Sequence, residues 1–205
     1  MLARERYREH AKGYDASARR TLRLRERAIA ALDLKPGEAV LDVACGAGLS
    51  FPLLVARVGA AGSVVGVELS TDMARYARER IAGAGWTQVT LIEAAAEQAA
   101  LPGPFDAVLF KFTHDVLQSP AALANIFAAA NPGARVAAAG SKLLPWWLEV
   151  ANVWVRRINA PYLTTFAGLR RPWQGLLAYV PDLRVRAALW GAAYIAHGRT
   201  RARRS

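Results

Sequence analysis

Short apolar runs alternate with amphipathic stretches throughout residues 39–141. The runs suit strands buried on both faces, and the stretches between them place apolar residues at helical spacing. Five strands are expected, near residues 39–44, 63–68, 89–92, 105–110 and 134–140. Because strands that alternate with helices form parallel sheets with right-handed crossovers, the pattern predicts a doubly wound α/β sheet with helices on both faces.

The pattern changes on both sides of this core. Residues 17–32 place apolar side chains on one helical face and arginines on the others, which predicts a helix before the first strand. Residues 143–158 and 162–180 are rich in aromatic residues and interrupted by proline and glycine, which predicts helices or helical loops. Two further strands, 183–190 and 192–196, meet at a glycine and predict an antiparallel hairpin. The predicted fold class is therefore α/β: a Rossmann-like seven-stranded sheet, mostly parallel with a C-terminal antiparallel hairpin, in a single domain.

The stretch with the most chemical information is VLDVACGAGLS, from Val40 to Ser50. A buried strand leads into a turn that carries almost no side-chain bulk, so a ligand can lie against the backbone and the free N–H groups of the next helix. The second strand then ends at Glu68, and an acidic residue at that point binds ribose hydroxyls in Rossmann-type folds. Together the two features predict a nucleoside-containing ligand at the carboxyl ends of the strands.

Charge is distributed unevenly along the chain. The net charge of +11 divides into +4 for residues 1–38, −2 for 39–141 and +9 for 142–205. A basic excess attracts nucleic acid, anionic lipid or acidic substrates without choosing among them, and an arginine-rich proteome would produce the same excess. Cys45 is the only cysteine, which excludes an internal disulfide and fits a reducing compartment. With no signal peptide or membrane-spanning apolar segment visible in the sequence, we expect a cytoplasmic protein.

The stretch VLDVACGAG, followed by VVGVELSTDMARYARER, resembles the class I S-adenosylmethionine-dependent methyltransferases, in particular the small single-domain members similar to the ubiquinone-biosynthesis enzymes. The resemblance covers residues 14–141 by motif and the C-terminal hairpin by topology. It implies S-adenosyl-L-methionine as the cofactor and S-adenosyl-L-homocysteine as its product. The first glycine of the family's usual DxGxG pattern is Ala44 here, a small change that the family tolerates.

The resemblance also assigns residues to the cofactor. Asp42, Ala44, Gly46 and Gly48 would enclose the methionine half, Glu68 would bind the ribose diol, and Leu69 with Met73 would face the adenine. After the third strand, Ala95 stands where the family commonly has an acid, so the adenine amine would depend on the backbone of Ala96 or on Glu97. Two further contacts would come from Tyr14, in an early Tyr-Asp pair typical of a lid, and from the backbone of Lys111.

Two other nucleotide-dependent classes fit less well. A nicotinamide dehydrogenase would carry a third glycine in GxGxxG, and the residues after Gly48 are Leu49, Ser50 and Phe51. A nucleic-acid base methyltransferase would carry an Asn/Asp-Pro-Pro-aromatic sequence after the fourth strand, where this chain has Lys-Phe-Thr-His. A non-catalytic cofactor-binding protein of the same fold is the alternative from a different class.

Methyl transfer needs an aligned acceptor, and a base only where that acceptor must lose a proton. His114 is the candidate general base, since its reference pKa lies near neutrality. A purely structural role at the end of the fourth strand is the competing interpretation. No metal is expected.

The acceptor is expected to lie under the aromatic segment after the fifth strand. Trp146, Trp147, Tyr162 and Trp173 can hold an aromatic, an amine or a natural-product-like small molecule, or they can belong to the core. The Leu-Leu-Pro-Trp-Trp sequence beside arginines also suits a membrane surface, so peripheral membrane contact and a lipid or quinone acceptor form the alternative. No nucleic-acid partner is favoured, and the sequence does not choose between a monomer and a homodimer.

These assignments give a division of the single domain, residues 1–205. An N-terminal lid with helices would occupy 1–34, the cofactor-binding core 35–141 and an aromatic cap 142–182. The hairpin would occupy 183–198 and a basic tail 199–205.

Overall fold

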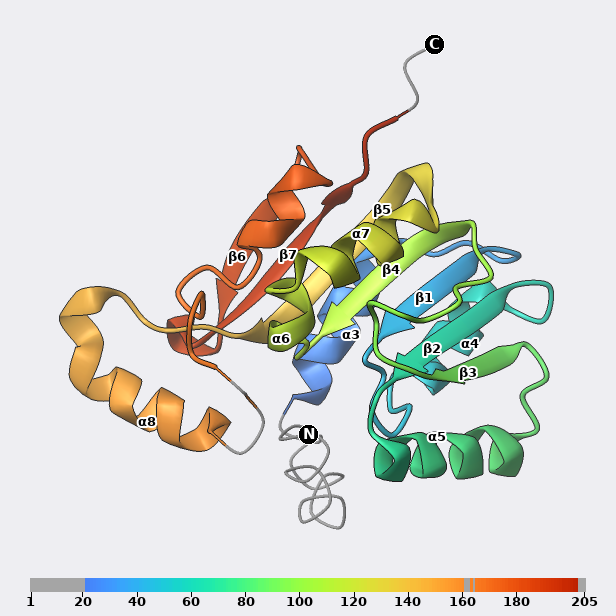
Figure 1. The fold of residues 1–205 in the computed structure, drawn as a ribbon, viewed down its shortest axis with the longest axis horizontal. Coiled ribbons are helices and arrows are strands. Elements are labelled where there is room, and N and C mark those ends of the chain that lie inside the picture. Colours follow the sequence, from blue (N-terminus) through green and yellow to red (C-terminus); the bar gives the residue numbers. More distant parts are fainter. Residues whose placement is uncertain (1–20, 161–162, 164, 203–205) are drawn as a thin grey trace.

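The structure is a computed structural model that describes residues 21–160, 163 and 165–202. Its centre is a seven-stranded sheet of order β3-β2-β1-β4-β5-β7-β6, drawn in Figure 1. The strands are β1 (Ala39–Val43), β2 (Ser63–Glu68), β3 (Val89–Glu93), β4 (Phe105–Lys111), β5 (Ala130–Ser141), β6 (Arg184–Ala188) and β7 (Ala193–Arg199). The first five are parallel, whereas β7 pairs antiparallel with both β5 and β6. The predicted fold class is confirmed.

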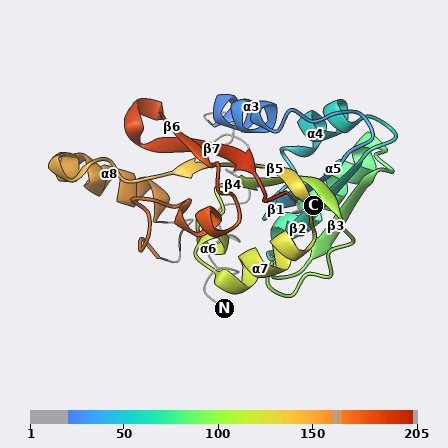
Figure 2. The ribbon, with the colours of Figure 1, turned by 90° about the horizontal axis from the view of Figure 1, so that it is seen from above.

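Helices cover both faces of the sheet, as Figure 2 shows from above. The helices are α3 (Leu22–Ala31), α4 (Phe51–Val58), α5 (Thr71–Ala84), α6 (His114–Leu117), α7 (Pro120–Ala128) and α8 (Glu149–Asn159), with short 3₁₀ turns η2 (Trp146–Leu148), η3 (Gln174–Ala178) and η4 (Leu189–Gly191). α3, α4 and α5 contribute to the core on one face of the sheet, and α6, α7 and η3 to the core on the other. The two layers follow from strands whose residues alternate between two apolar faces.

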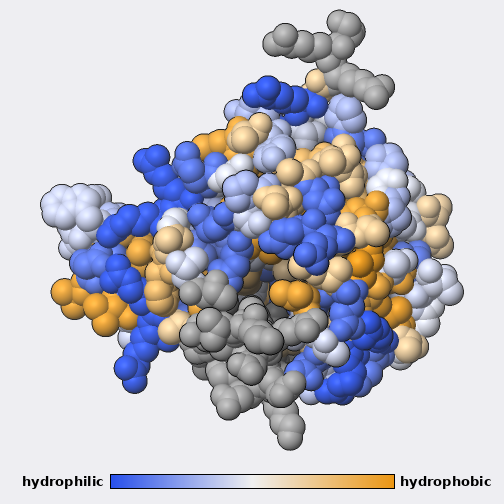
Figure 3. All heavy atoms as spheres, in the orientation of Figure 1, coloured by the Kyte–Doolittle hydropathy of each residue, from blue (hydrophilic) through white to orange (hydrophobic). Residues whose placement is uncertain are grey.

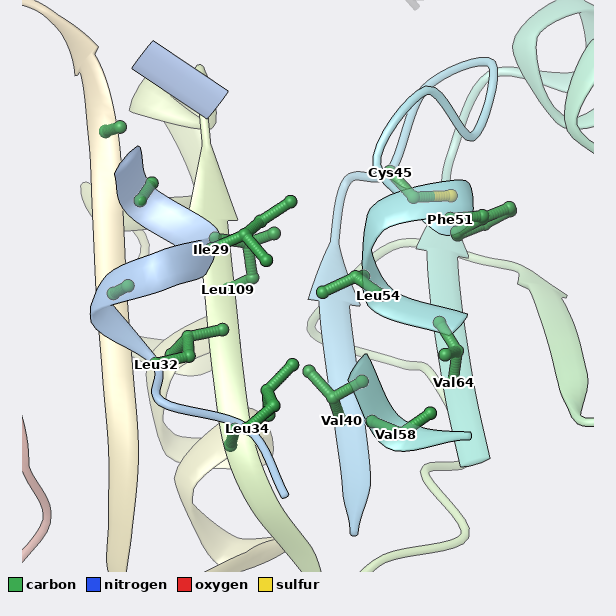
Figure 4. Close-up of a cluster of buried hydrophobic side chains, with 14 of the residues drawn as sticks. Ile29, Leu32, Leu34, Val40, Cys45, Phe51, Leu54, Val58, Val64 and Leu109 are labelled. Atoms are coloured by element: carbon green, nitrogen blue, oxygen red, sulfur yellow. The ribbon is translucent and has the colours of Figure 1, made fainter. Parts of the chain in front are cut away.

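The first of these cores fixes the helix that follows β1 (Figure 4). Leu54 and Val58 of α4 lie over Val40 of β1 and Val64 of β2, and all four side chains are fully buried. A buried leucine or valine contributes about 1.5–3 kcal/mol by leaving water. The turn between β1 and α4 is therefore held at both of its ends by packed core.

Three strand boundaries differ most from the sequence prediction. β5, expected over 134–140, begins at Ala130 and runs on to Ser141. The extension is held by pairing of Ala130 with Phe105 and by a hydrogen bond from Asn131 Nδ2 to Asp106 Oδ1 (2.9 Å). The hairpin strands, expected over 183–190 and 192–196, are shorter and longer, respectively, because the turn η4 occupies Leu189–Gly191 and β7 pairs with β5 as far as Arg199.

Candidate active site

The turn after β1 is built from three residues with left-handed backbone. Ala44, Gly46 and Gly48 have φ of 48°, 60° and 70°, a region that glycine adopts without steric cost and alanine at a small cost. The Cys45 N–H donates to the Val67 carbonyl (2.9 Å), which ties the turn to β2. The turn therefore lies beside the end of the second strand, as the sequence predicts.

Glu68 connects the turn after β1 with the start of the loop after β2. Its Oε2 accepts from the Gly46 N–H and its Oε1 from the Ser70 N–H, each at 2.8 Å. Burial raises the pKa of the Glu68 carboxyl, while the N–H groups of Ser70, Gly46 and Leu69 and the charge of Lys111 oppose that rise. Each carboxylate oxygen has two acceptor sites, so Glu68 retains capacity for two further donors, such as the hydroxyls of a ribose.

Asp42 is a buried acid whose hydrogen-bonding needs are not met by the described chain. It is 0% exposed, and neither of its carboxylate oxygens has a hydrogen-bond partner among the described residues. Burial raises the pKa of Asp42 to about 6, against the lowering effects of Lys111, Arg25 and the nearby Ser50 hydroxyl. Because an unpartnered buried acceptor is costly, the arrangement favours a ligand that brings a donor or a cation to Asp42.

Lys111, at the end of β4, places a buried amine opposite these carboxyl groups. It is 5% exposed. Burial lowers the pKa of Lys111 to about 8, Arg25 lowers it further, and Asp42, Cys45 and Glu68 act in the opposite direction. Asp42, Glu68, Lys111 and Arg25 thus bring two acids and two bases from four elements to one place, which we call the charge cluster.

The charge cluster suits the cofactor that the sequence predicts. S-adenosyl-L-methionine carries an ammonium, a carboxylate, a sulfonium and a ribose diol. The unpartnered oxygens of Asp42 match the ammonium, Lys111 matches the carboxylate, and the spare acceptor sites of Glu68 match the diol. The residues present therefore fit this group.

Cys45 lies inside the same turn, but its thiol is not activated as a nucleophile. Burial raises the pKa of its thiol well above the ordinary value, with Asp42 and Glu68 adding to the rise. A nucleophilic cysteine needs the opposite shift. Cys45 instead fills space beside Phe51, as Figure 4 shows.

Polar groups without partners follow directly after Lys111. Thr113 Oγ1, His114 Nδ1 and Asp115 Oδ1 are buried and have no hydrogen-bond partner among the described residues. His114 Nε2 lies 2.8 Å from the Ala167 carbonyl. Since a carbonyl can only accept, Nε2 carries the proton and Nδ1 is left as a free acceptor. The sequence singled out His114, but the unpartnered neighbours become visible only in the structure.

The remaining predicted cofactor residues lie along the same edge. Leu69 is 41% exposed, whereas Met73 is buried in the first turn of α5. Ala95 is half-buried and Ala96 buried. Exposed Glu97 accepts a hydrogen bond from Ser119 Oγ (2.9 Å), so it is engaged with the start of α7. Tyr14 lies outside the described residues, and all these roles stay predictions.

Asn125 is a supporting residue that sequence reasoning missed. Its Nδ2 donates to the carbonyls of Ala96 (2.9 Å) and Ala99 (3.0 Å), which fixes the loop after β3 from α7. An asparagine inside an apolar helical pattern was the available signal, because such a residue usually bonds to backbone nearby.

The predicted substrate aromatics are not brought together around a cavity. Trp146 and Trp147 are 74% and 66% exposed, while Trp173 packs on the buried ring of Tyr194 with centroids 4.8 Å apart. Tyr162 lies outside the described residues. The aromatic cap therefore stays a prediction, without support from these positions.

A basic surface hollow of about 520 Å³ lies between the end of α6 and the segments around α8. Its lining residues are Gln118, Leu143, Arg156, Phe166, Gly168, Leu169, Arg170, Arg171 and Gln174. It adjoins Ala167, the residue that holds the His114 ring. An acceptor with an anionic group would be complementary to this hollow.

Comparison with protein families identifies a methyltransferase domain over residues 40–133. Two curated relatives are demethylmenaquinone methyltransferases. The protein from Symbiobacterium thermophilum is 30% identical over 144 residues, 66% of this chain and 57% of its own length. The protein from Shouchella clausii is 33% identical over 109 residues, 51% of this chain and 46% of its own length. The chain thus spans about half the length of these relatives.

Solved structures share the fold at low sequence identity. A SAM-dependent methyltransferase from Aquifex aeolicus superposes with a TM-score of 0.61 at 23% identity, over 86% of this chain and 89% of its own. A SAM-dependent O-methyltransferase from Thermotoga maritima gives 0.62 at 16% identity, over 89% and 66%. The predicted family, the class I S-adenosyl-L-methionine-dependent methyltransferases, and its cofactor are confirmed. The predicted small-molecule acceptor is not.

Proposed function

Because residues 40–133 form a methyltransferase domain of the class I S-adenosyl-L-methionine-dependent family, we propose that the protein transfers the cofactor's methyl group to a small-molecule acceptor. The observation that supports this proposal is the buried Asp42 carboxyl, which has no hydrogen-bond partner in the described part of the chain and belongs to one charge cluster with Glu68. A purely structural turn would not keep such a group at the end of a core strand, since its burial is costly.

The cofactor would be held by residues from the ends of β1, β2 and β4. Asp42 would bind the ammonium of the methionine part, Lys111 its carboxylate and Glu68 the ribose hydroxyls. Leu69 and Met73 would flank the adenine, and the left-handed turn would let the backbone approach closely. When bound, the cofactor supplies a methyl group already activated as part of a sulfonium, so the protein's work is alignment and exclusion of water.

The acceptor would lie beside the three unpartnered groups after β4. His114 Nδ1 can take a proton from an acceptor hydroxyl, because the Ala167 carbonyl keeps the other proton on Nε2. Thr113 Oγ1 and Asp115 Oδ1 can orient the acceptor's polar groups. If the acceptor loses a proton in the transition state, we expect His114→Ala to reduce kcat by about 10²-fold or more.

A quinone or other lipid acceptor is the second candidate, and a specific observation favours it. Both curated relatives described above are named for demethylmenaquinone, a lipid quinone. In its reduced, hydroquinone form such a ring carries hydroxyls, and His114 Nδ1 is placed to accept the proton of one of them. The non-catalytic alternative predicts cofactor binding without methyl transfer.

The decisive experiment follows labelled methyl groups from S-adenosyl-L-methionine into a metabolite and lipid extract, with product identification by mass spectrometry. We expect label in a small, extractable acceptor. Cofactor binding measured by calorimetry without any transferred label would support the non-catalytic alternative, and absence of binding would exclude both functions.

A matched pair of glycine substitutions tests the cofactor site. Gly46 and Gly85 have similar positive φ of 60° and 66°, and nothing lies within 4 Å of a Cβ at Gly85. Gly46→Leu and Gly85→Leu therefore each place a leucine at a positive φ, but only the first places bulk beside Glu68. We expect Gly46→Leu to lose cofactor binding and Gly85→Leu to keep it; equal affinities would refute this placement of the cofactor.

A further inference from the structure

The segment η2–α8 turns an apolar surface outward. Its most exposed apolar side chains are Trp146 (74% exposed), Trp147 (66%), Val150 (90%), Val153 (61%), Trp154 (68%) and Ile158 (47%). We call these six residues the α8 face. In both ribbon views α8 lies at the edge of the molecule remote from β3 (Figures 1 and 2), and Figure 3 shows apolar atoms among polar ones at that edge.

The polar side of α8 faces the protein, the reverse of an ordinary surface helix. Asn152 is fully buried. It accepts from the Leu144 N–H (2.7 Å) and donates to the Leu144 carbonyl (3.1 Å) and to Glu149 Oε2 (2.9 Å). Glu149 also pairs with Arg156 (2.6 Å) and Arg170 (3.0 Å). These contacts fix the orientation of α8, and they therefore hold its apolar side toward solvent.

The β6–β7 turn extends the same surface. Trp190 is 103% exposed and Leu189 54% exposed. A Cβ added at Gly191 would lie 3.2 Å from Leu144 Cδ2, so this turn adjoins the residue that anchors α8. Tryptophan is the residue typical of membrane–water interfaces, where its apolar ring and polar N–H meet both phases.

The charge around the α8 face favours an anionic lipid surface over a second copy of the chain as its binding partner. The segment from residue 142 to the C-terminus carries a net charge of +9, and Arg157 lies exposed on α8 itself. Arg156, Arg170 and Arg171 line the adjacent hollow. A second copy of the chain would bring like charge against like charge, whereas anionic lipid head groups complement the arginines while the acyl region receives the apolar side chains.

We propose that the α8 face, with the β6–β7 turn, docks the protein on the surface of an anionic lipid bilayer, with α8 lying in the plane of the interface. No helix among the described residues is long and apolar enough to cross a membrane, so the contact is peripheral. The proposal goes beyond methyl transfer and does not depend on it, because binding to vesicles needs neither cofactor nor acceptor.

Co-sedimentation of the full chain with vesicles tests the proposal. We expect binding to vesicles of phosphatidylcholine mixed with phosphatidylglycerol, weaker binding to phosphatidylcholine alone, and weakening by salt as Debye screening increases. The double variant Val150→Ser/Trp154→Ser should weaken binding by about tenfold or more, since apolar burial and charge act together. Leu177→Ser, at a leucine 41% exposed on η3, is the matched control and should bind normally.

A second pair separates charge from apolar contact. Arg157→Gln should weaken binding to the mixed vesicles, while Arg75→Gln on α5, paired there with Glu79, should not. Circular dichroism confirms that each variant is folded. Equal binding by the α8-face variant and its control would overturn the proposal. So would a reversible dimer, seen by analytical ultracentrifugation without vesicles, that the α8-face variant abolishes while vesicle binding is absent.

Discussion

At the scale of single residues, the charge cluster is a compromise between stability and binding. Asp42 and Lys111 are both held in a place that disfavours their charged forms: the pKa of Asp42 is raised to about 6 and that of Lys111 lowered to about 8. The free protein therefore carries an energetic cost at neutral pH. A ligand with complementary charges would relieve this cost, and the relief would add to the free energy of binding at the end of β1.

Asp42→Asn tests this compromise through pH. The ordinary pKa of an aspartic acid side chain is 3.8, and burial raises the pKa of Asp42 to about 6 in the folded protein, so ionisation opposes folding. The cost is small at pH 4, grows as the pH rises to 6 and is constant above about pH 7. We expect the stability of the variant relative to wild type to rise by about 2 kcal/mol between pH 4 and pH 7.

Chemical denaturation at several pH values measures this difference, and calorimetry at pH 7 should show that the stabilised variant has lost cofactor affinity. A stability difference that does not change with pH would mean that Asp42 is already neutral or paired in the folded protein.

The sequence pointed to Gly46 and Glu68 by residue type and spacing, and the family resemblance added Asp42 and the backbone of Lys111. That the Lys111 side chain enters the charge cluster could not be predicted, since it depends on β4 lying beside β1 in the sheet. The free acceptors at Thr113, His114 and Asp115 were also hidden, because whether a polar group finds a partner depends on distant segments. Ala167, which holds the His114 ring, is 53 positions away.

At the scale of elements, α8 shows what periodicity cannot tell. The sequence predicted helices or helical loops over 143–158, and the structure has η2 followed by α8, which ends at Asn159. A helical period reveals that one side of a helix is apolar, but not whether protein, lipid or water covers that side. Only the placement of Asn152 against Leu144 shows that the polar side faces inward.

Asn152→Ala should release α8 without unfolding the sheet. The substitution removes three hydrogen bonds and leaves the half-buried Leu144 N–H without its partner, at a cost of about 1–3 kcal/mol for an unsatisfied group. The Leu144 carbonyl keeps its hydrogen bond from Arg170 Nη1 (3.2 Å). In hydrogen exchange we expect faster exchange for the α8 amides and unchanged protection for β1 and α4. Asn159→Ala, which removes one bond to the Val155 carbonyl within α8 (2.8 Å), serves as the control; equal effects would deny Asn152 its anchoring role.

At the scale of the whole molecule, the strand order was the most predictable property. Alternating strands and helices, with a terminal hairpin, leave few arrangements once crossovers are right-handed. The division into lid, core, cap, hairpin and tail stays a prediction, as do the cytoplasmic location and the oligomeric state.

Ligand binding should stabilise the whole sheet, since the proposed contacts come from β1, β2 and β4 together. At a cofactor concentration about 100 times the Kd, mass action adds about 2.7 kcal/mol and should raise Tm by roughly 5–10 °C for a chain of this size. Thermal melts with S-adenosyl-L-homocysteine measure this shift. An unchanged Tm at near-millimolar ligand would contradict the cofactor assignment. It would not bear on the proposal that the α8 face binds an anionic bilayer.

The antiparallel pairing of β7 with β5 has a last consequence. Ala193 pairs with Ser141, so the β6–β7 turn lies at the same edge as the carboxyl ends of the parallel strands. The β6–β7 turn, α8 and the proposed cofactor site therefore lie on one side of the molecule. On a bilayer, an acceptor dissolved in the lipid would meet the enzyme by lateral diffusion. Turnover would then follow the mole fraction of acceptor in the membrane, and dilution with inert lipid would slow it at constant total acceptor.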